Sequence, residues 1–213
     1  MPGIEDLSPE EILGQPFPLF ELVGKDGSVA FAFQGIHSEH IDELVHFSLT
    51  DELIAEETPR DPDERFITRQ SAISYLSSRP HYTLVSENGG FAGLIWFGAQ
   101  EWHTDVAESP NYTFAIRIYG DARGNGYAPE FVNQALLYFI FDKDPNGVWL
   151  EYNTDNTAAR HLYDKTHWVE IDQRQTRDSR GRLKDRTIMQ LDIEIGMRSY
   201  RMSEQIPVYR KES

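Results

Sequence analysis

A glycine-containing turn between an expected strand and an expected helix constrains this chain more than any other part of its sequence. Residues 112–119 (YTFAIRIY) are rich in β-branched and aromatic side chains, a composition typical of a half-buried strand. Residues 123–128 (RGNGYA) contain two glycines, and Pro129 then suits the first turn of a helix. Apolar residues follow at helical spacing: Phe131, Ala135, Leu136, Tyr138 and Phe139. This order leaves several backbone N–H groups without hydrogen-bond partners at the N-terminus of a helix, which is the positive end of its dipole. Such an arrangement binds phosphate or pyrophosphate.

Two other phosphate-binding fingerprints do not fit this turn. A dinucleotide fingerprint needs a third glycine where Pro129 stands, and a P-loop needs a Gly-Lys-Ser/Thr sequence that is missing here. The pattern that fits is Gln/Arg-x-x-Gly-x-Gly/Ala, in which Arg123, Gly126 and Ala128 fill all the specified positions. This pattern resembles the coenzyme A loop of the GNAT superfamily of N-acetyltransferases. An ordinary strand-to-helix turn is the alternative for the motif taken alone.

A second motif resembles the same superfamily further along the chain. Residues 148–153 (VWLEYN) read as another strand, and the family's core then closes with Asn-x-x-Ala-x-x-Leu-Tyr-x-Lys-x-Gly-Phe. The matching residues are Asn156, Ala159, Leu162, Tyr163 and Lys165, with Trp168 as a conservative replacement of phenylalanine. His167 departs from the pattern, because the family usually has glycine there. The two motifs stand in the correct order, and the resemblance covers roughly residues 80–195.

The other expected elements follow the order of the acetyltransferase fold. Alternation and turn residues predict strands at residues 28–35, 81–87, 90–98, 168–172 and 187–195. Apolar spacing predicts helices at residues 39–49, capped by Ser38, and at about 63–78. The resemblance implies a single-domain α/β (α+β) fold, with a mixed central sheet of about six to seven strands flanked by helices. We expect an irregular lead-in over residues 1–24, the acetyltransferase domain over 25–197 and a C-terminal tail over 198–213.

The composition excludes several kinds of site. The chain has 213 residues and no cysteine, which excludes disulfides, thiolate catalysis and Cys-based zinc sites. No apolar run approaches the roughly 18 residues of a membrane helix, and no secretory signal is visible, so we expect a cytoplasmic protein without membrane contact. His37 and His40 have no obvious third ligand, and no metal site is expected.

Charge is distributed unevenly along the chain. The net charge of −15 at pH 7 argues against a nucleic-acid partner, because phosphate backbones favour basic surfaces. Residues 1–64 hold sixteen acids and only two bases, which leaves the rest of the chain near neutral. An acidic surface on this segment would raise the local concentration of cationic amines. The simpler alternative is a face that only keeps the protein soluble.

The resemblance implies acetyl-CoA as the co-substrate and assigns residues to it. Backbone groups of Ile116 and Ile118 are expected to align the pantetheine arm. The pyrophosphate is expected to bind the amides of the glycine turn, which belong to Arg123, Gly124, Asn125, Gly126, Tyr127 and Ala128. The side chain of Arg123 would add a charge that does not titrate, and Asn156 would hydrogen-bond the coenzyme.

The sequence indicates the catalytic residues less clearly than the residues that would bind the coenzyme. Tyr163 matches the usual general acid of the family, and a phenol is protonated at neutral pH, although a tyrosine that only packs is the alternative. Many family members place a glutamate where this chain has Thr113. His103 has the intrinsic chemistry of a base, and Glu151 on the strand at 148–153 is a second candidate. Proton removal through water would require neither.

These features predict an acyl-CoA-dependent N-acyltransferase that transfers acetyl from acetyl-CoA to a primary amine by direct attack. The acceptor would be a small-molecule amine or a peptide, with a cationic acceptor favoured by the acidic segment, and the chain could act as a homodimer. Two alternatives stay open. One is a non-catalytic acyl-CoA-binding or scaffolding module of the same fold, which Thr113 favours. The other is a peptide or protein N-terminal acetyltransferase.

Overall fold

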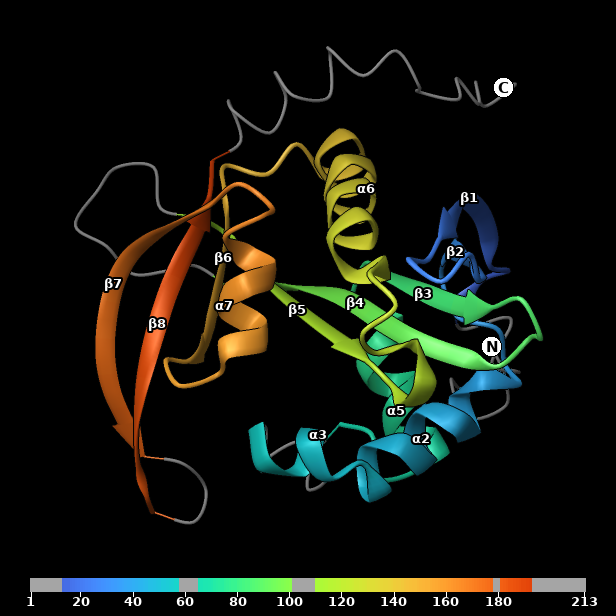
Figure 1. The fold of residues 1–213 in the computed structure, drawn as a ribbon, viewed down its shortest axis with the longest axis horizontal. Helices are drawn as coiled ribbons and strands as arrows, with labels where there is room; N and C mark the ends of the chain where they lie inside the picture. Colours follow the sequence, from blue (N-terminus) through green and yellow to red (C-terminus); the bar gives the residue numbers. More distant parts are fainter. Residues whose placement is uncertain (1–12, 58–64, 101–109, 178–180, 193–213) are drawn as a thin grey trace, which may run out of the picture.

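The computed structural model describes residues 13–57, 65–100, 110–177 and 181–192 (Figure 1). The strands are β1 (Phe17–Val23), β2 (Val29–Gln34), β3 (His81–Ser86), β4 (Phe91–Ala99), β5 (Tyr112–Ile118), β6 (Val148–Asn153), β7 (Trp168–Arg177) and β8 (Leu183–Leu191). The helices are α2 (His40–Thr50), α3 (Glu52–Glu57), α5 (Arg69–Ser77), the short 3-10 helix η2 (Gly120–Ala122), α6 (Tyr127–Lys143) and α7 (Thr157–Tyr163). Within these described ranges, no helix combines the length and the apolar character needed to cross a membrane.

One eight-stranded sheet organises the described part of the chain, in the order β1-β2-β3-β4-β5-β6-β8-β7. Neighbouring strands are antiparallel except for β5 and β6, which are parallel. Helices lie on both faces of the sheet (Figure 1). The predicted α/β fold with a mixed sheet flanked by helices is therefore confirmed. The predicted number of strands, six to seven, was too low.

The first strand accounts for part of that difference, because it lies in the segment expected to be irregular. β1 pairs with β2 from Phe17 opposite Gln34 to Val23 opposite Val29. Pro18 is tolerated because β1 is an edge strand, where a missing N–H costs little. The pairing register with β2 shifts just after this proline. The buried side chains of β1, Leu19 and Leu22, are therefore three residues apart, and the sequence does not show the two-residue alternation of a regular strand.

The expected element boundaries also needed correction. α2 begins at His40 without a side-chain cap, so the predicted cap by Ser38 is wrong. The second helix was expected from about residue 63 and begins instead at Arg69. There the Thr68 hydroxyl accepts from the Ser71 amide at 3.0 Å, and the Ser71 hydroxyl accepts from the Thr68 amide at 3.0 Å. The closing hairpin is longer than expected, since β7 reaches Arg177 and β8 starts at Leu183 rather than at 187.

Two apolar clusters cover the two faces of the sheet. On one face, α6 and α7 pack over the central strands, and the rings of Phe97 and Phe139 stack with centroids 3.7 Å apart. On the other face, Leu44 of α2 and Leu76 of α5 pack in one cluster with Trp96. β4 contributes to both clusters because successive side chains of a strand point to opposite faces. This packing holds β5, the strand that leads into the glycine turn, at the centre of the molecule.

Candidate active site

β5 and β6 pair only at their first residues. The structure forms the pairs Tyr112–Val148 and Thr113–Trp149, and the two strands diverge beyond them (Figure 1). On its other side, β5 stays paired with β4 as far as Ile118. The second half of β5 therefore has one edge without a neighbouring strand. We call the place where the two strands part the fork of β5 and β6.

The backbone of β5 presents two residues to this fork. The amide of Tyr119 donates to a carbonyl of β4 at 2.9 Å, whereas the amide of Tyr112 donates on the opposite side to Gly147 at 3.3 Å. Because backbone groups alternate in direction along a strand, those of Ile116 and Ile118 face the fork. The structure thus places both residues where alignment of a pantetheine arm would require them, and that role stays a prediction.

The glycine turn lies between η2 and α6, directly after β5. Gly124 and Gly126 have φ angles of 82° and 88°, in the left-handed region that favours glycine, and Gly126 is the N-cap of α6. Within the described residues, no hydrogen bond is donated by the backbone amides of Gly124, Asn125, Gly126, Tyr127 and Ala128. The amide of Arg123 differs, because it donates to the Gly120 carbonyl at 3.2 Å. The turn therefore fits a pyrophosphate group, which would bind unpaired amides at a helix N-terminus.

The side chain of Arg123 has two partners inside the protein, and its predicted contact with the coenzyme stays a prediction. Its Nε donates to the Ile118 carbonyl at 2.7 Å, and its Nη2 lies 2.6 Å from Oδ2 of Asp51. The Asp51 side chain is only 8% exposed, and its Oδ1 also accepts from the amide of Leu53 at 3.1 Å. The guanidinium thus ties the glycine turn to the end of α2, and Asp51 balances its charge.

Tyr163 ends α7 and lies beside the fork. Its side chain is buried among aromatic rings, with centroids 6.4 Å from Phe114, 5.5 Å from Tyr152 and 5.8 Å from Trp168. Phe114 is the first residue of β5 beyond its pairs with β6. Burial raises the pKa of Tyr163 above its ordinary value, with a smaller contribution from Tyr152. The hydroxyl is therefore protonated at neutral pH, which is compatible with a general acid and also with a packed tyrosine.

Asn156 occupies the N-cap of α7. Its side-chain oxygen accepts from the amide of Ala159 at 2.9 Å, which satisfies one amide of the first helical turn. The sequence motif therefore has a structural function here in addition to the predicted contact with the coenzyme. That contact stays a prediction.

The residues considered for the general base have different surroundings. The hydroxyl of Thr113 donates to the Gly98 carbonyl at 3.3 Å. Glu151 is exposed on the face of β6 opposite the buried side chains of Leu150 and Tyr152. Its carboxylate forms an ion pair with the guanidinium of Arg174 on β7. His103 lies outside the described residues, as does the whole segment 101–109.

The closing strands place cationic side chains on the same face as Glu151. Arg174 of β7 lies directly opposite Arg186 of β8, and Arg186 is also in register with Asn153 of β6. Like charges placed directly opposite in a sheet are destabilising unless other groups compensate them. Arg174 has Glu151 as its counter-ion, whereas Nε of Arg186 is buried with no hydrogen-bond partner among the described residues.

The turn between β1 and β2 contacts the glycine turn, and the sequence reasoning missed it. The amide of Lys25 donates to the Asn125 carbonyl at 2.7 Å, and the hydroxyls of Ser28 and Tyr127 are in contact. The signal that could have found this hairpin is the dipeptide Asp26-Gly27, a favoured tight-turn pair. The turn of the β1–β2 hairpin therefore adjoins the candidate coenzyme site.

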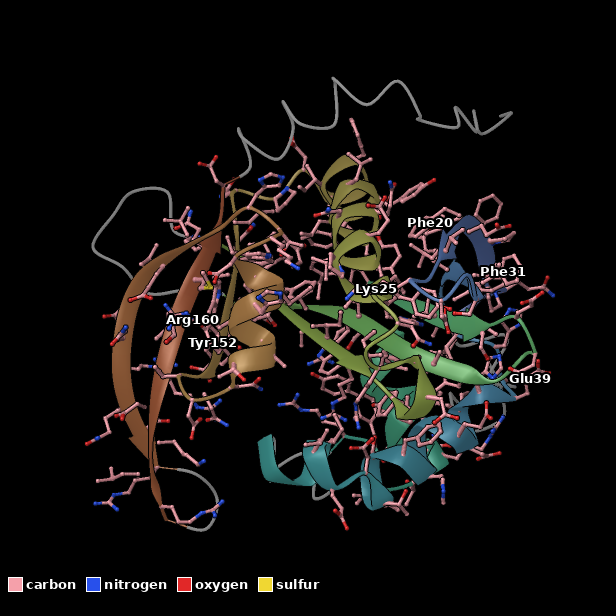
Figure 2. The ribbon with its side chains drawn as sticks, in the orientation of Figure 1. Phe20, Lys25, Phe31, Glu39, Tyr152 and Arg160 are labelled. Atoms are coloured by element: carbon pink, nitrogen blue, oxygen red, sulfur yellow. The ribbon has the colours of Figure 1, made fainter. Side chains whose placement is uncertain are left out.

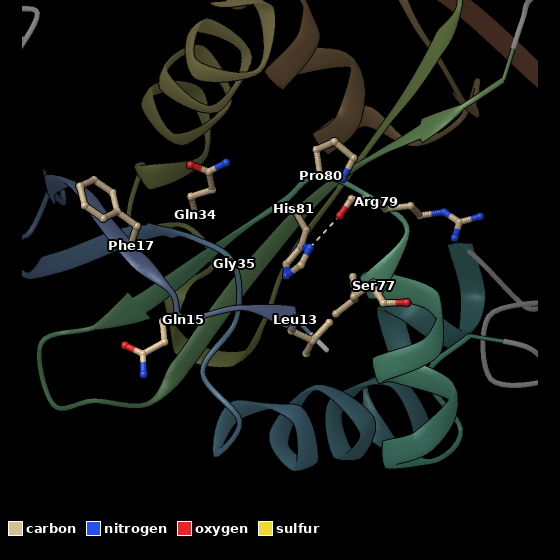
Figure 3. A pocket seen from close by; sticks show the side chains of 10 residues that line it. Leu13, Gln15, Phe17, Gln34, Gly35, Ser77, Arg79, Pro80 and His81 are labelled. Carbon is tan, nitrogen blue, oxygen red and sulfur yellow. Dashed lines mark hydrogen bonds between the residues drawn. The ribbon is translucent and has the colours of Figure 1, made fainter. Parts of the chain in front are cut away.

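A separate hollow of about 270 Å³ lies at the other end of the β1–β2 hairpin (Figure 3). Its lining includes Phe17, Gln34 and His81. Nδ1 of His81 is 2.8 Å from the Arg79 carbonyl and must carry the proton, which leaves Nε2 buried and without a partner among the described residues. Burial lowers the pKa of His81, so the ring is neutral. The hollow lies at the end of the hairpin away from the glycine turn, and none of its lining residues belongs to β5, β6 or the glycine turn.

Comparison with protein families identifies one match. Residues 32–169 match the model of the acetyltransferase (GNAT) domain, and this segment is more than half of the chain. The match contains the fork, the glycine turn and Tyr163. No curated protein shows significant sequence similarity to the chain.

Solved structures of acetyltransferases share the fold at low sequence identity. A GNAT-family acetyltransferase from Streptococcus pneumoniae has a TM-score of 0.61 at 19% identity, covering 76% of this chain and 98% of that one. A spermidine N-acetyltransferase SpeG chimera from Vibrio cholerae and hSSAT has 0.61 at 15% identity, covering 79% and 98%. The ribosomal-protein-S5-alanine acetyltransferase from Vibrio fischeri has 0.62 at 10% identity, covering 80% and 95%. At such identities the likeness shows the fold alone.

Proposed function

Because this chain belongs to the GNAT acetyltransferase family, we propose that it is an acyl-CoA-dependent N-acyltransferase that transfers acetyl from acetyl-CoA to a primary amine. The observation that carries the proposal is the continuity of the fork with the glycine turn. One strand, β5, has no neighbouring strand beside Ile116 and Ile118 on the side of the fork, where the Ile118 carbonyl accepts from the Arg123 side chain. β5 then leads into a turn in which the backbone amides of residues 124–128 donate no hydrogen bond within the described residues. Acetyl-CoA has complementary groups in that order, a long flexible pantetheine arm that carries the thioester and then a pyrophosphate.

In this proposal, the chain's backbone holds the co-substrate. The amides of residues 124–128 would bind the pyrophosphate, and the positive end of α6 would favour its charge. Backbone groups of Ile116 and Ile118 would align the pantetheine arm, with Asn156 as an additional contact. Acetyl-CoA supplies the activated acyl group when bound, and the fork orients it toward the acceptor.

Tyr163 would supply the proton that direct transfer requires. When the amine nitrogen bonds to the acyl carbon, the sulfur leaves as a thiolate, and a nearby acid makes that departure easier. Burial keeps the proton on the phenolic oxygen of Tyr163 across the neutral pH range. Its place beside Phe114, where β5 leaves β6, supports this role.

The amine must lose a proton, and Glu151 or His103 is proposed to accept it. Glu151 is partly exposed and paired with Arg174, so it would act through a water molecule rather than by direct contact. A non-catalytic acyl-CoA-binding module is the second candidate function. It is favoured by Thr113, whose hydroxyl bonds to a backbone carbonyl and cannot replace a carboxylate base.

The acceptor is proposed to be a small amine or a peptide. Spermidine and a ribosomal-protein alanine appear in the names of two structural neighbours, which supports both classes. A preference for cationic acceptors is proposed from the acidic segment, and N-terminal acetylation of a peptide or protein is the variant that the second neighbour suggests. A cytoplasmic location and a homodimer are further parts of the proposal.

Two measurements test the proposed function. Millimolar acetyl-CoA should raise the melting temperature of the purified chain, because a ligand that binds only the folded state stabilises it. Thiol release from acetyl-CoA should then appear with at least one member of a panel of amines, amino acids and peptides. An unchanged melting temperature would contradict coenzyme binding. A raised melting temperature without thiol release across the panel would favour the non-catalytic module.

A further inference from the structure

The turn of the β1–β2 hairpin places a lysine against the glycine turn. The amide of Lys25 donates to the Asn125 carbonyl at 2.7 Å. A Cβ atom built on Gly126 would lie 3.0 Å from Cγ and 3.0 Å from Cε of Lys25, so the lysine side chain runs directly over that glycine. Figure 2 shows Lys25 beside the N-terminal end of α6. A cationic side chain therefore lies at the edge of the amide cluster.

Contacts on both sides of Lys25 hold the hairpin turn in this place. The amide of Gly24 donates to the Ser28 carbonyl at 2.7 Å, which closes the turn. The amide of Ser28 donates to the Asp26 side chain at 3.0 Å, and the Ser28 hydroxyl contacts that of Tyr127 in the first turn of α6. The position of Lys25 is thus fixed relative to the helix N-terminus by backbone and side-chain contacts.

Lys25 and Arg123 are two cationic side chains at this turn. Arg123 is nearer in sequence, but Asp51 balances its guanidinium at 2.6 Å. Lys25 forms no ion pair with any described residue, and its neighbour Asp26 is hydrogen-bonded to Ser28. Five backbone amides without a hydrogen bond and one ammonium without an ion pair are therefore donors at the N-terminus of α6. An anion is the group that would accept from them.

We propose that Lys25 binds a phosphate group of coenzyme A and is the charged side chain of that subsite. The inference rests on the proposed function and adds a residue from outside the sequence motif. Lysine suits this role because its ammonium is a compact point charge on a flexible stem. The phosphate is either in the pyrophosphate, next to the amides of the turn, or at the 3′ position of the ribose. The two phosphate groups present the same chemistry to a lysine, and the ligands used in the test distinguish between the two positions.

The test measures dissociation constants of Lys25→Met and Lys25→Arg for three ligands. Methionine keeps an unbranched chain over Gly126 and removes the charge, whereas arginine keeps the charge. The ligands are coenzyme A, dephospho-coenzyme A, which lacks the 3′-phosphate, and pantetheine, which lacks all phosphates. Lys143→Met is the matched control, because Lys143 ends the same helix and pairs with Asp142 at 3.0 Å. The melting temperature of each ligand-free variant reports whether the hairpin still folds.

We expect Lys25→Met to weaken coenzyme A binding about tenfold or more, as for one lost charged contact, and Lys25→Arg to restore most of it. Pantetheine binding and the Lys143→Met variant should be unchanged. A loss that persists with dephospho-coenzyme A assigns Lys25 to the pyrophosphate, and a loss confined to coenzyme A assigns it to the 3′-phosphate. Equal weakening of pantetheine, or no effect on coenzyme A, would overturn the role of Lys25. A wild-type chain that binds no coenzyme A would overturn the proposed function itself.

Discussion

The two sides of the fork differ in the chemical groups that form them. On the proposed coenzyme side the groups belong mainly to the backbone, namely the open edge of β5 and the amides at the start of α6. On the proposed acceptor side they belong to side chains, with acids on α2 and α3 and arginines on β7 and β8. Backbone geometry follows from local sequence, whereas the effect of a charged side chain depends on its partner. The first side is therefore much more constrained by sequence than the second.

The acidic segment illustrates how strongly pairing changes a charge pattern. Asp42 forms an ion pair with Arg69 at 2.9 Å, and Asp51 forms one with Arg123 at 2.6 Å. Glu43 accepts from the Phe91 amide at 3.2 Å and contacts His40. Several acids of α2 and its end thus have structural partners. The unpaired negative charge of this segment is therefore smaller than the count of acids indicates.

The strongest test of the coenzyme side is Gly126→Val. A β-branched residue is strained at a φ of 88°, and its Cβ would meet the Lys25 side chain at 3.0 Å. We expect the dissociation constant for coenzyme A to rise roughly 100-fold or more, since such strain costs about 1–3 kcal/mol and the amides must also shift. Gly89→Val is the control, because Gly89 also has a positive φ of 83° but lies in the β3–β4 turn. Coenzyme A binding at wild-type strength in Gly126→Val would mean that the turn is not the pyrophosphate site.

The next largest effect is expected for Tyr163→Phe. Removing the hydroxyl should lower kcat by roughly 10²-fold, the lower end for a lost general acid, while the dissociation constant for coenzyme A changes little. Tyr152→Phe is the matched control, since its ring lies 5.5 Å from that of Tyr163 in the same cluster. Unchanged turnover in Tyr163→Phe would reduce the residue to packing and leave water to protonate the thiolate.

Burial also predicts how Tyr163 responds to pH. Because burial raises its pKa, the hydroxyl stays protonated above the range in which an exposed tyrosine, with a pKa of about 10, begins to ionise. The kcat of the wild-type protein should therefore show no loss from this group as the pH rises toward 10. A decline of kcat near pH 9 that disappears in Tyr163→Phe would show that its pKa is not raised.

The features that were predicted correctly from the sequence are those that depend on residues close together in the chain. The turn at residues 123–128, the strand before it and the helix after it are local patterns, and the structure has all three. β1 escaped prediction because Pro18 and the adjacent register shift conceal its alternation. The Arg123–Asp51 pair joins residues 72 apart in sequence, and no local pattern reports such a contact. The contact of the β1–β2 turn with the glycine turn, which brings Lys25 next to Gly126, is equally invisible to local patterns.

On the acceptor side, a smaller effect is expected for Glu151→Gln. An exposed carboxylate that acts through water contributes less than a contacting base, whose loss costs about 10²–10⁴-fold, so we expect a fall in kcat/KM on the order of tenfold. Coenzyme A binding should not change. Arg174→Gln distinguishes a catalytic from a purely structural role of Glu151, because it removes the ion pair but keeps the carboxylate. If Arg174→Gln lowers kcat/KM as much as Glu151→Gln and both keep the wild-type pH profile, Glu151 has only a structural role.

The smallest effect is expected from the charge of the acidic segment. Since Asp42 and Asp51 are already paired, the remaining acids should favour cationic over neutral amines by only a few-fold in kcat/KM, well below the 10–10³-fold that strong electrostatic steering reaches. The preference should shrink at high salt, because screening weakens interactions between exposed charges. Glu52→Gln removes one exposed acid at the start of α3 and should reduce the preference for cationic amines further, whereas Glu87→Gln, in the β3–β4 turn, should not.

Arg174 and Arg186 would instead attract acidic acceptors. A preference for acidic acceptors that also fades with salt would therefore show that the β7–β8 side determines acceptor charge. A preference that salt does not change would assign acceptor choice to shape and hydrogen bonding instead.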